Sequence, residues 1–119
     1  MIAENLKQIK RRIIKAARRV GRDPADVRLV AVTKERSVVT VAEGIRTGVR
    51  FLGENKVQEA KTKFVELFKQ YPNLELHLTG PLQTNKVKSA LHIFKVFQTL
   101  DREKLANEFL KFPNLTKDK

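Results

Sequence analysis

The sequence predicts an α/β fold, namely the N-terminal half of a (β/α)8 barrel of the TIM type. Short apolar runs that suit buried strands alternate along the chain with longer amphipathic segments that suit helices. The runs begin near residues 27, 49, 74 and 96, and this regular spacing is typical of barrel units. Strands separated by helices pair in parallel, so we expect about four parallel βα units preceded by one amphipathic helix. An open, doubly wound sheet with helices on both faces is the alternative.

Length and composition predict a single domain covering residues 1–119. Hydrophobic residues make up 41% of the chain and charged residues 32%, which suits a folded protein with a modest core. The chain contains no cysteine, which excludes disulfides, thiolate zinc sites and cysteine nucleophiles. No apolar stretch approaches the length of a membrane span, and no secretory signal follows the basic N-terminus. We therefore expect a soluble, cytoplasmic protein without a membrane partner.

Residues 1–22 are predicted to form the amphipathic N-terminal helix. Its apolar residues recur at steps of three and four, and Gly21 and Pro24 mark its end. The opposite face carries six basic residues, Lys7, Lys10, Arg11, Lys15, Arg18 and Arg19. Such a face, in a chain of net charge +12, suits nucleic acid, an anionic membrane surface or an acidic partner. We favour the plainer interpretation, in which the apolar face packs on the domain and the charges are solvated.

The four βα units are predicted to span residues 27–112. The expected strands are 27–33, 49–52, 74–78 and 96–100. The expected helices lie around 38–47, 57–71, 87–94 and 102–112. Ser37 is a suitable N-cap for the first of these helices, and Asp101 for the last. Residues 113–119 are predicted to be a polar, frayed tail.

Four units leave a barrel of this type half complete. A closed barrel needs eight βα units, and a four-stranded sheet has two open edges that pair readily with other strands. Either the chain is one half of a barrel, or it associates with itself to close one. The expected protein partner is therefore a second copy of the chain or a second half-barrel.

Lys34 ends the apolar run 29–33 and is the most informative candidate residue. The carboxyl ends of parallel strands form the edge at which barrel active sites lie. An amine at this edge, partly desolvated, can lose its proton near neutral pH and attack an aldehyde to form a Schiff base. Taken by itself, a lysine at a strand end more often points its charge at solvent.

Polar residues also mark the next two strands. Asn55 follows the second strand within Gly53-Glu54-Asn55 and can cap the next helix or donate a neutral hydrogen bond. His77 lies in the third strand on the face opposite the leucines, where a satisfied core histidine is the plainer interpretation. Together with Lys34, these residues suit a cofactor that carries an aldehyde and a phosphate. No glycine-rich nucleotide-binding loop is present. Since His77 and His92 are not at metal-ligand spacing, we expect no metal site.

Four segments of the chain resemble the pyridoxal phosphate homeostasis protein family in order and in spacing. They are 17–24 (ARRVGRDP), 29–34 (LVAVTK), 51–59 (FLGENKVQE) and 77–86 (HLTGPLQTNK). The similarity runs from about residue 4 to residue 112, and four collinear motifs make a specific signal. This family is a single-domain barrel similar to the N-terminal domain of alanine racemase.

The resemblance implies that Lys34 holds pyridoxal 5′-phosphate as a Schiff base, with Asn55 and His77 as further cofactor-binding residues. It implies a role in intracellular homeostasis of this cofactor without strong catalytic turnover. Racemases with a similar barrel use a catalytic tyrosine from a second domain, whereas the single tyrosine here, Tyr71, belongs to the apolar face of a helix. The chain is therefore not expected to be an enzyme.

The chain departs from the family pattern at three residues and in one larger respect. Thr33 stands where serine is usual, Leu76 where tryptophan is common, and Thr79 where the family has an apolar residue. The phosphate-binding residues of the family lie in the second half of the barrel, and these four units do not include them. Two other functions stay open: a basic interaction module that binds nucleic acid or anionic surfaces through the N-terminal helix, and a truncated, inactive form.

Overall fold

The computed structural model describes residues 2–119 and confirms the predicted α/β fold. Four parallel strands form one sheet in which each strand lies beside its neighbours in sequence. They are β1 (Val30–Val32), β2 (Phe51–Glu54), β3 (Glu75–Leu78) and β4 (Val96–Phe97). A barrel adds its strands in this consecutive order, whereas a doubly wound sheet reverses direction at a switch point. The order β1-β2-β3-β4 therefore matches half of a barrel.

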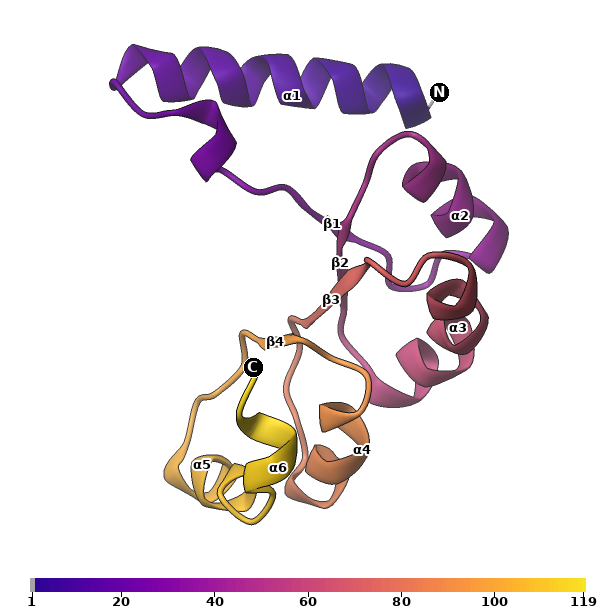
Figure 1. Ribbon diagram of the computed structural model, residues 1–119, viewed down its shortest axis with the longest axis vertical. Helices are drawn as coiled ribbons and strands as arrows, with labels where there is room; N and C mark the ends of the chain where they lie inside the picture. The colour runs from indigo at the N-terminus through magenta and orange to yellow at the C-terminus, as the bar shows by residue number, and fades with distance from the viewer. Residues whose placement is uncertain (1) are drawn as a thin grey trace.

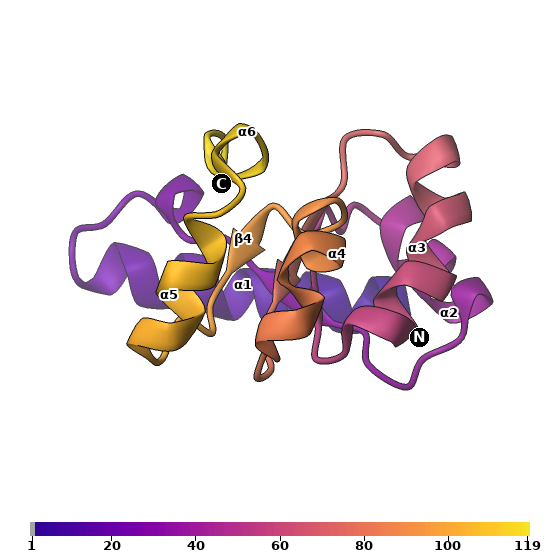
Figure 2. The same cartoon turned by 90° about the horizontal axis from the view of Figure 1, so that it is seen from below.

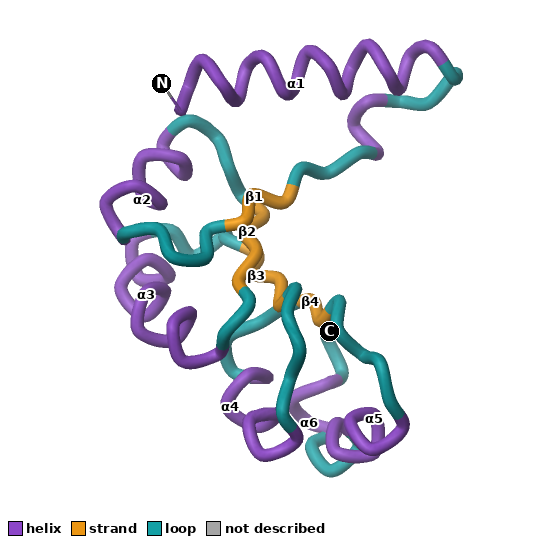
Figure 3. The backbone as a smooth tube through the Cα atoms, turned by 180° about the vertical axis from the view of Figure 1, so that it is seen from behind, coloured by secondary structure: helices purple, strands orange, loops and turns teal. Residues whose placement is uncertain are grey.

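Helices cover one side of this curved sheet (Figures 1 and 3). The connecting helices are α2 (Val38–Arg46), α3 (Val57–Gln70) and α4 (Val87–Leu91), and α5 (Glu103–Phe109) follows β4. Figure 2 shows α3, α4 and α5 following one another around the sheet. Two short 3-10 helices, η1 (Pro24–Asp26) and η2 (Thr84–Lys86), complete the connections. Of the helices in residues 2–119, none has both the length and the apolarity needed to cross a membrane.

The core lies between the sheet and these helices. Alternate strand residues, such as Leu52, Leu76 and Leu78, face the helices and pack in one cluster with Phe64 of α3 and the nearby Phe94. The other residues of each strand face the concave side, because successive side chains of a strand point to opposite faces. Val32 on that side is 55% exposed, so the concave side is open where the interior of a closed barrel would be filled.

The N-terminal helix α1 (Ile2–Arg19) lies across one end of this open side (Figure 1). Leu6 and Ala17 are its buried residues, whereas Ile9 and Ile14 of the apolar face stay exposed. The predicted packing of this helix on the domain is therefore only partial. A groove of about 380 Å³ separates α1 from the start of β1 and β2, with Leu6, Ile13, Leu29 and Phe51 among its lining residues.

Local sequence signals set most of the element boundaries. The Ser37 hydroxyl accepts a hydrogen bond from the Thr40 amide at 3.2 Å, which confirms the predicted cap of α2. The first and fourth strands are shorter than predicted, at Val30–Val32 and Val96–Phe97, because β1 and β4 are edge strands that each pair with one neighbour only. The predicted cap at Asp101 is wrong: α5 begins after Arg102 without a side-chain cap, and Asp101 instead binds the Arg102 guanidinium at 2.9 Å.

The expectation of a frayed tail is also wrong. Pro113–Thr116 form a short helix, α6, with the proline in its first turn. Leu115 packs against the core cluster, and the Lys95 ammonium lies 3.4 Å from the Asp118 carboxylate. The division of the chain into 1–22, 27–112 and 113–119 as parts of one domain stays a prediction.

Candidate functional site

Lys34 lies on a tight turn at the carboxyl end of β1. The Thr33 amide donates to the Gly53 carbonyl oxygen at 2.8 Å and so continues the pairing of β1 with β2. The chain then turns back, because the Arg36 amide donates to the Thr33 carbonyl at 3.1 Å. Glu35, the third residue of this turn, has a φ of 60°. Lys34 itself is exposed, so the strand delivers an accessible amine at the predicted edge.

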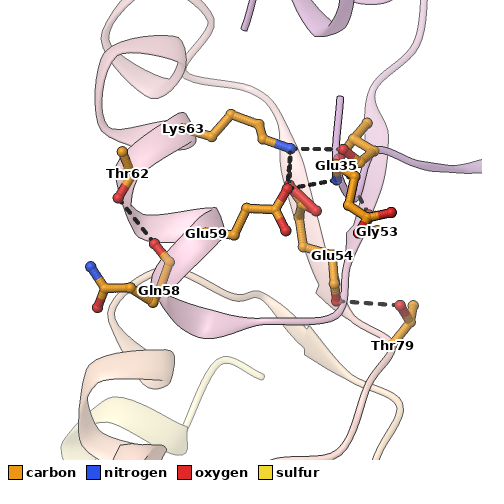
Figure 4. Close-up of polar contacts among 9 residues, drawn as sticks. Glu35, Gly53, Glu54, Gln58, Glu59, Thr62, Lys63 and Thr79 are labelled. Atoms are coloured by element: carbon orange, nitrogen blue, oxygen red, sulfur yellow. Dashed lines mark hydrogen bonds and ion pairs between the residues drawn. The ribbon is translucent and has the colours of Figure 1, made fainter. Parts of the chain in front are cut away.

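Three charged residues next to this turn form what we call the α3 cluster: Glu54 at the end of β2, and Glu59 and Lys63 of α3 (Figure 4). The Lys63 ammonium lies 2.6 Å from Glu54 Oε1 and 3.2 Å from Glu59 Oε2. Glu54 points to the helix side of the sheet by strand alternation, which is why it meets α3. The cluster therefore links the end of β2 to α3 on the helix side of the sheet, next to the Lys34 turn.

Two of the three charges of this cluster are largely removed from water, whereas the Glu59 side chain is 29% exposed. Glu54 is fully buried and Lys63 is 6% exposed. Burial raises the pKa of the Glu54 carboxyl, and the ammonium of Lys63 opposes that rise. Neither Glu54 oxygen accepts a hydrogen bond of good geometry from within residues 2–119, so the Lys63 ammonium, 2.6 Å from Oε1, is the group that compensates this buried charge. Such a pair is costly to break, since either partner alone would be a buried, uncompensated charge.

Sequence reasoning missed this cluster, although one signal was available. Lys63 belongs to the stripe Ala60, Lys63, Phe64 and Leu67, whose spacing of three and four residues is the buried face of α3. A lysine at such a position needs a buried anion. The only acidic residue of the preceding strand is Glu54.

Asn55 is held against the end of β3. The Thr79 hydroxyl lies 2.9 Å from Asn55 Oδ1 and 3.2 Å from the Glu54 carbonyl oxygen. The possible role of Asn55 as a helix cap is wrong, because α3 begins after Lys56 and has no side-chain cap. Gly80 packs so closely here that an added Cβ would lie 2.7 Å from the Asn55 carbonyl oxygen. The ends of β2 and β3 are therefore in direct contact.

His77 lies on the concave face of β3 with both ring nitrogens bonded. Its Nε2 is 2.9 Å from Glu75 Oε1, and its Nδ1 is 2.9 Å from Gln98 Nε2. Since a carboxylate only accepts, Nε2 carries the proton and Nδ1 accepts from the amide of Gln98. The ring also meets Phe51 edge-on, at 6.2 Å between centroids. We call Glu75, His77 and Gln98 the concave cluster. Both ring nitrogens of His77 have a hydrogen-bond partner within it, as the plainer interpretation of this histidine predicts.

The structure brings the three candidate residues to one side of the sheet without joining their side chains. Pairing places the ends of β1, β2 and β3 next to each other, with Val32 opposite Gly53 and Gly53 opposite His77. The hydrogen bonds found within residues 2–119 link Asn55 to Thr79 and His77 to the concave cluster, and Lys34 is in neither set. In the same part of the chain, no three histidine or acidic side chains gather in a way that would hold a metal ion.

These features define the class of the molecule as one half of a parallel (β/α) barrel with an accessible lysine at its carboxyl edge. No family model matches the chain. It is 42% identical over 105 residues to the pyridoxal phosphate homeostasis protein of Pseudomonas aeruginosa, covering 88% of this chain and 45% of that protein. It is also 42% identical over 108 residues to the protein of that name from Escherichia coli K12, with the same coverage. The chain thus spans about half the length of the curated relatives it matches.

Solved structures give the same result. PipY of Synechococcus elongatus PCC7942, solved without pyridoxal phosphate, superposes with a TM-score of 0.80 at 32% identity, over 99% of this chain and 50% of that chain. A second PipY structure, with pyridoxal phosphate bound, gives a TM-score of 0.79 at 32% identity, over 96% of this chain and 49% of that one. The resemblance in the sequence motifs is confirmed: this chain is homologous to the pyridoxal phosphate homeostasis proteins over about half of their length.

Proposed function

We propose that this protein binds pyridoxal 5′-phosphate and serves its intracellular homeostasis, holding the cofactor as a Schiff base on Lys34 without strong catalytic turnover. The observation that carries the proposal is the exposed Lys34 amine on a tight turn at the carboxyl edge of the sheet. Homology to pyridoxal phosphate homeostasis proteins, and to a PipY that was solved with pyridoxal phosphate bound, supports it. The proposal places the protein in the cytoplasm and includes neither a metal ion nor a membrane partner.

The residues at the edge fit the aldehyde half of this cofactor. An aldehyde supplies the electrophile; the Lys34 nitrogen forms the bond to its carbon, and the oxygen leaves as water. The hydroxyl of Thr79 fixes Asn55 Oδ1, and we assign the neighbouring NH₂ group of Asn55 as a neutral hydrogen-bond donor to the cofactor. We assign His77 a place beside the cofactor ring, where its surface rather than a free ring nitrogen makes the contact.

We propose that the protein is not an enzyme. Tyr71 is half-buried against the core at the C-terminal end of α3, just before β3. That is the amino end of the sheet, so Tyr71 lies away from the edge that carries Lys34. A tyrosine in this place supports packing rather than proton transfer at the cofactor.

The phosphate group needs further residues, which we propose come from a second half-barrel. Phosphate sites in barrels are commonly built from loops after the seventh and eighth strands, and the four strands here correspond to half of such a barrel. The open concave side, with Val32 exposed, is the surface that this partner would close. The partner is a second copy of the chain or another half-barrel. A solution mass equal to one chain, unchanged by cofactor, would contradict closure by a second copy.

The Schiff-base assignment is tested by adding pyridoxal phosphate, following the visible absorption, and reducing with borohydride before peptide mass spectrometry. We expect the main labelled peptide to be modified at Lys34, above a slower background labelling of other exposed lysines such as Lys56, and loss of the main label in Lys34→Ala. Lys56→Ala is the matched control, because Lys56 is an exposed lysine that follows the neighbouring strand. Equal labelling of Lys34→Ala and the unchanged protein would refute the role of Lys34.

A further inference from the structure

The turn that carries Lys34 has a backbone conformation that is unfavourable for its sequence. A φ of 60° at the third residue suits glycine, whereas this position is Glu35. A residue other than glycine held in this region costs on the order of 1 kcal/mol or more, and it persists only where its surroundings enforce it. Some contact must therefore hold the turn in place.

Two side chains of α3 bind the backbone on both sides of Lys34. The Lys63 ammonium donates to the carbonyl oxygen of Thr33, the residue before Lys34, at 2.7 Å. A carboxylate oxygen of Glu59 accepts from the amide of Glu35, the residue after Lys34, at 2.6 Å. Both are hydrogen bonds to a charged group, which are the stronger kind in proteins. The backbone is thus held one residue before and one residue after the reactive amine.

The two holding groups are themselves fixed. Glu59 and Lys63 are four residues apart on one face of α3 and pair with each other at 3.2 Å. Lys63 is also drawn to the buried Glu54 at the end of β2. The hydrogen bond from Glu35 lowers the pKa of the Glu59 carboxyl, so Glu59 stays charged at neutral pH. Helix α3, strand β2 and the Lys34 turn therefore form one connected unit (Figure 4).

We propose that Glu59 and Lys63 are positioning residues for Lys34, which fix its turn and so limit where its amine can reach. The inference rests on the proposed function in one respect, because Lys34 matters only if it bonds an aldehyde. A fixed backbone lowers the entropy lost when the amine reaches the aldehyde carbon. Neither residue takes part in the bond; each acts through the backbone next to Lys34.

The first experiment measures how fast Lys34 is labelled by pyridoxal phosphate and borohydride in Glu59→Ala, Glu59→Gln and Lys61→Ala. Glu59→Ala removes the acceptor and is expected to slow labelling of Lys34 about tenfold, the effect of losing one charged hydrogen bond. Glu59→Gln keeps an oxygen acceptor and should recover most of the rate. Lys61→Ala, an exposed change on the same helix, should leave it unchanged. Labelling of Lys56, outside the held turn, should not slow in any variant.

Equal rates for Glu59→Ala and Lys61→Ala would overturn the proposal, as would slower labelling of Lys34 and Lys56 alike, which would indicate a general loss of structure. Glu59 is the primary test because removing Lys63 breaks a buried ion pair and can prevent folding. Lys63→Arg offers a second test, since a guanidinium can still donate to the Thr33 carbonyl and should retain more of the rate than Lys63→Met.

The second experiment needs no cofactor. Hydrogen exchange and NMR on the free protein should show the Glu35 amide protected in the unchanged chain, less so in Glu59→Gln, and unprotected in Glu59→Ala. The Glu35 amide resonance should also follow the titration of Glu59 at a pH below the usual glutamate value of 4.5. A Glu35 amide that exchanges equally in all variants would refute the positioning role even if Lys34 is labelled. Absence of labelling with a protected Glu35 amide would instead refute the proposed function alone.

Discussion

The α3 cluster and the concave cluster lie on opposite faces of the same sheet and differ in what they bind. Glu59 and Lys63 of the α3 cluster bind backbone groups next to Lys34. In the concave cluster, the His77 ring is hydrogen-bonded to the side chains of Glu75 and Gln98. The first cluster thus controls where a loop lies, whereas the second fixes the orientation of one ring. The more obvious chemical group, the histidine, is therefore the one with less influence on the Lys34 turn.

Burial separates one pair of the α3 cluster from the concave cluster. Glu54 and Lys63 are charged and almost fully removed from water, while Glu75 is 27% exposed, much like Glu59 at 29%. A buried charge pair is very sensitive to the loss of either partner, and a partly solvated network is less so. The two clusters should consequently respond to mutation with different magnitudes, and the following predictions test that difference.

The largest effect is expected for Lys63→Met. It leaves the fully buried Glu54 without a counter-charge and frees the Thr33 carbonyl, so it should lower the free energy of unfolding by about 3–5 kcal/mol. Urea denaturation measures this loss. Adding Glu54→Leu should restore most of the stability, because both charges are then gone. A double variant as unstable as Lys63→Met would show that the ion pair is not the cause.

Gly80→Ala tests the contact between the ends of β2 and β3. Its Cβ would lie 2.7 Å from the Asn55 carbonyl oxygen and 2.9 Å from Asn55 Cα, so the backbone must shift at a cost of about 1–3 kcal/mol. Gly44→Ala in α2 is the matched control, since its nearest neighbour would be 3.9 Å away and alanine favours helix by up to about 1 kcal/mol. Thermal melting should give opposite signs for the two variants, and equal signs would contradict the close contact.

A smaller effect is expected for His77→Phe in the concave cluster. The aromatic volume is kept while both ring hydrogen bonds are lost, and Glu75 can still reach water. The free energy of unfolding should fall by about 1 kcal/mol, well below the value for Lys63→Met. If the two variants cost the same, the contrast between the clusters fails.

The smallest effect concerns pH. The Glu35 amide lowers the pKa of Glu59, so Glu59 stabilises the fold above the unfolded value of 4.5 and this contribution is lost as the pH falls through its folded pKa. The stability difference between the unchanged protein and Glu59→Gln should shrink on acidification through this range. Burial raises the pKa of Glu54, which therefore acts with the opposite sign. Because Glu54 is present in both proteins, most of its contribution cancels in the difference, apart from the further rise that the charge of Glu59 causes. A constant difference across the range would contradict the Glu35–Glu59 bond.

Regular patterns made the fold predictable. The apolar runs and helical stripes set the four strands and their parallel order, and Ser37 set the start of α2. Asp101 and Asn55 were predicted as helix caps from residue type alone. In the structure, the Asp101 side chain binds Arg102 instead, and the Asn55 side chain binds Thr79. A cap preference is worth only about 1 kcal/mol, so a competing side-chain contact readily replaces it.

The candidate site was predictable only in part. Lys34 could be placed because its position follows directly from the end of one strand. Gln98, which is hydrogen-bonded to the His77 ring, lies 21 residues further along the chain. No local sequence pattern predicts that contact. The α3 cluster was missed because it joins a strand, a turn and a helix whose relative positions exist only in the folded chain.

The positive φ of Glu35 makes residue 35 a position at which evolution can change the stability of the Lys34 turn. The turn uses the amide of residue 35 in its hydrogen bond to Glu59, and no part of that bond comes from the residue 35 side chain. Glycine or asparagine at this position would adopt the same backbone at lower cost. Substitutions at residue 35 therefore change the energetic cost of holding the turn and leave its bond to Glu59 in place. Under the proposed function, a sequence lineage can in this way alter how firmly the Lys34 turn is held while every proposed cofactor-binding residue stays the same.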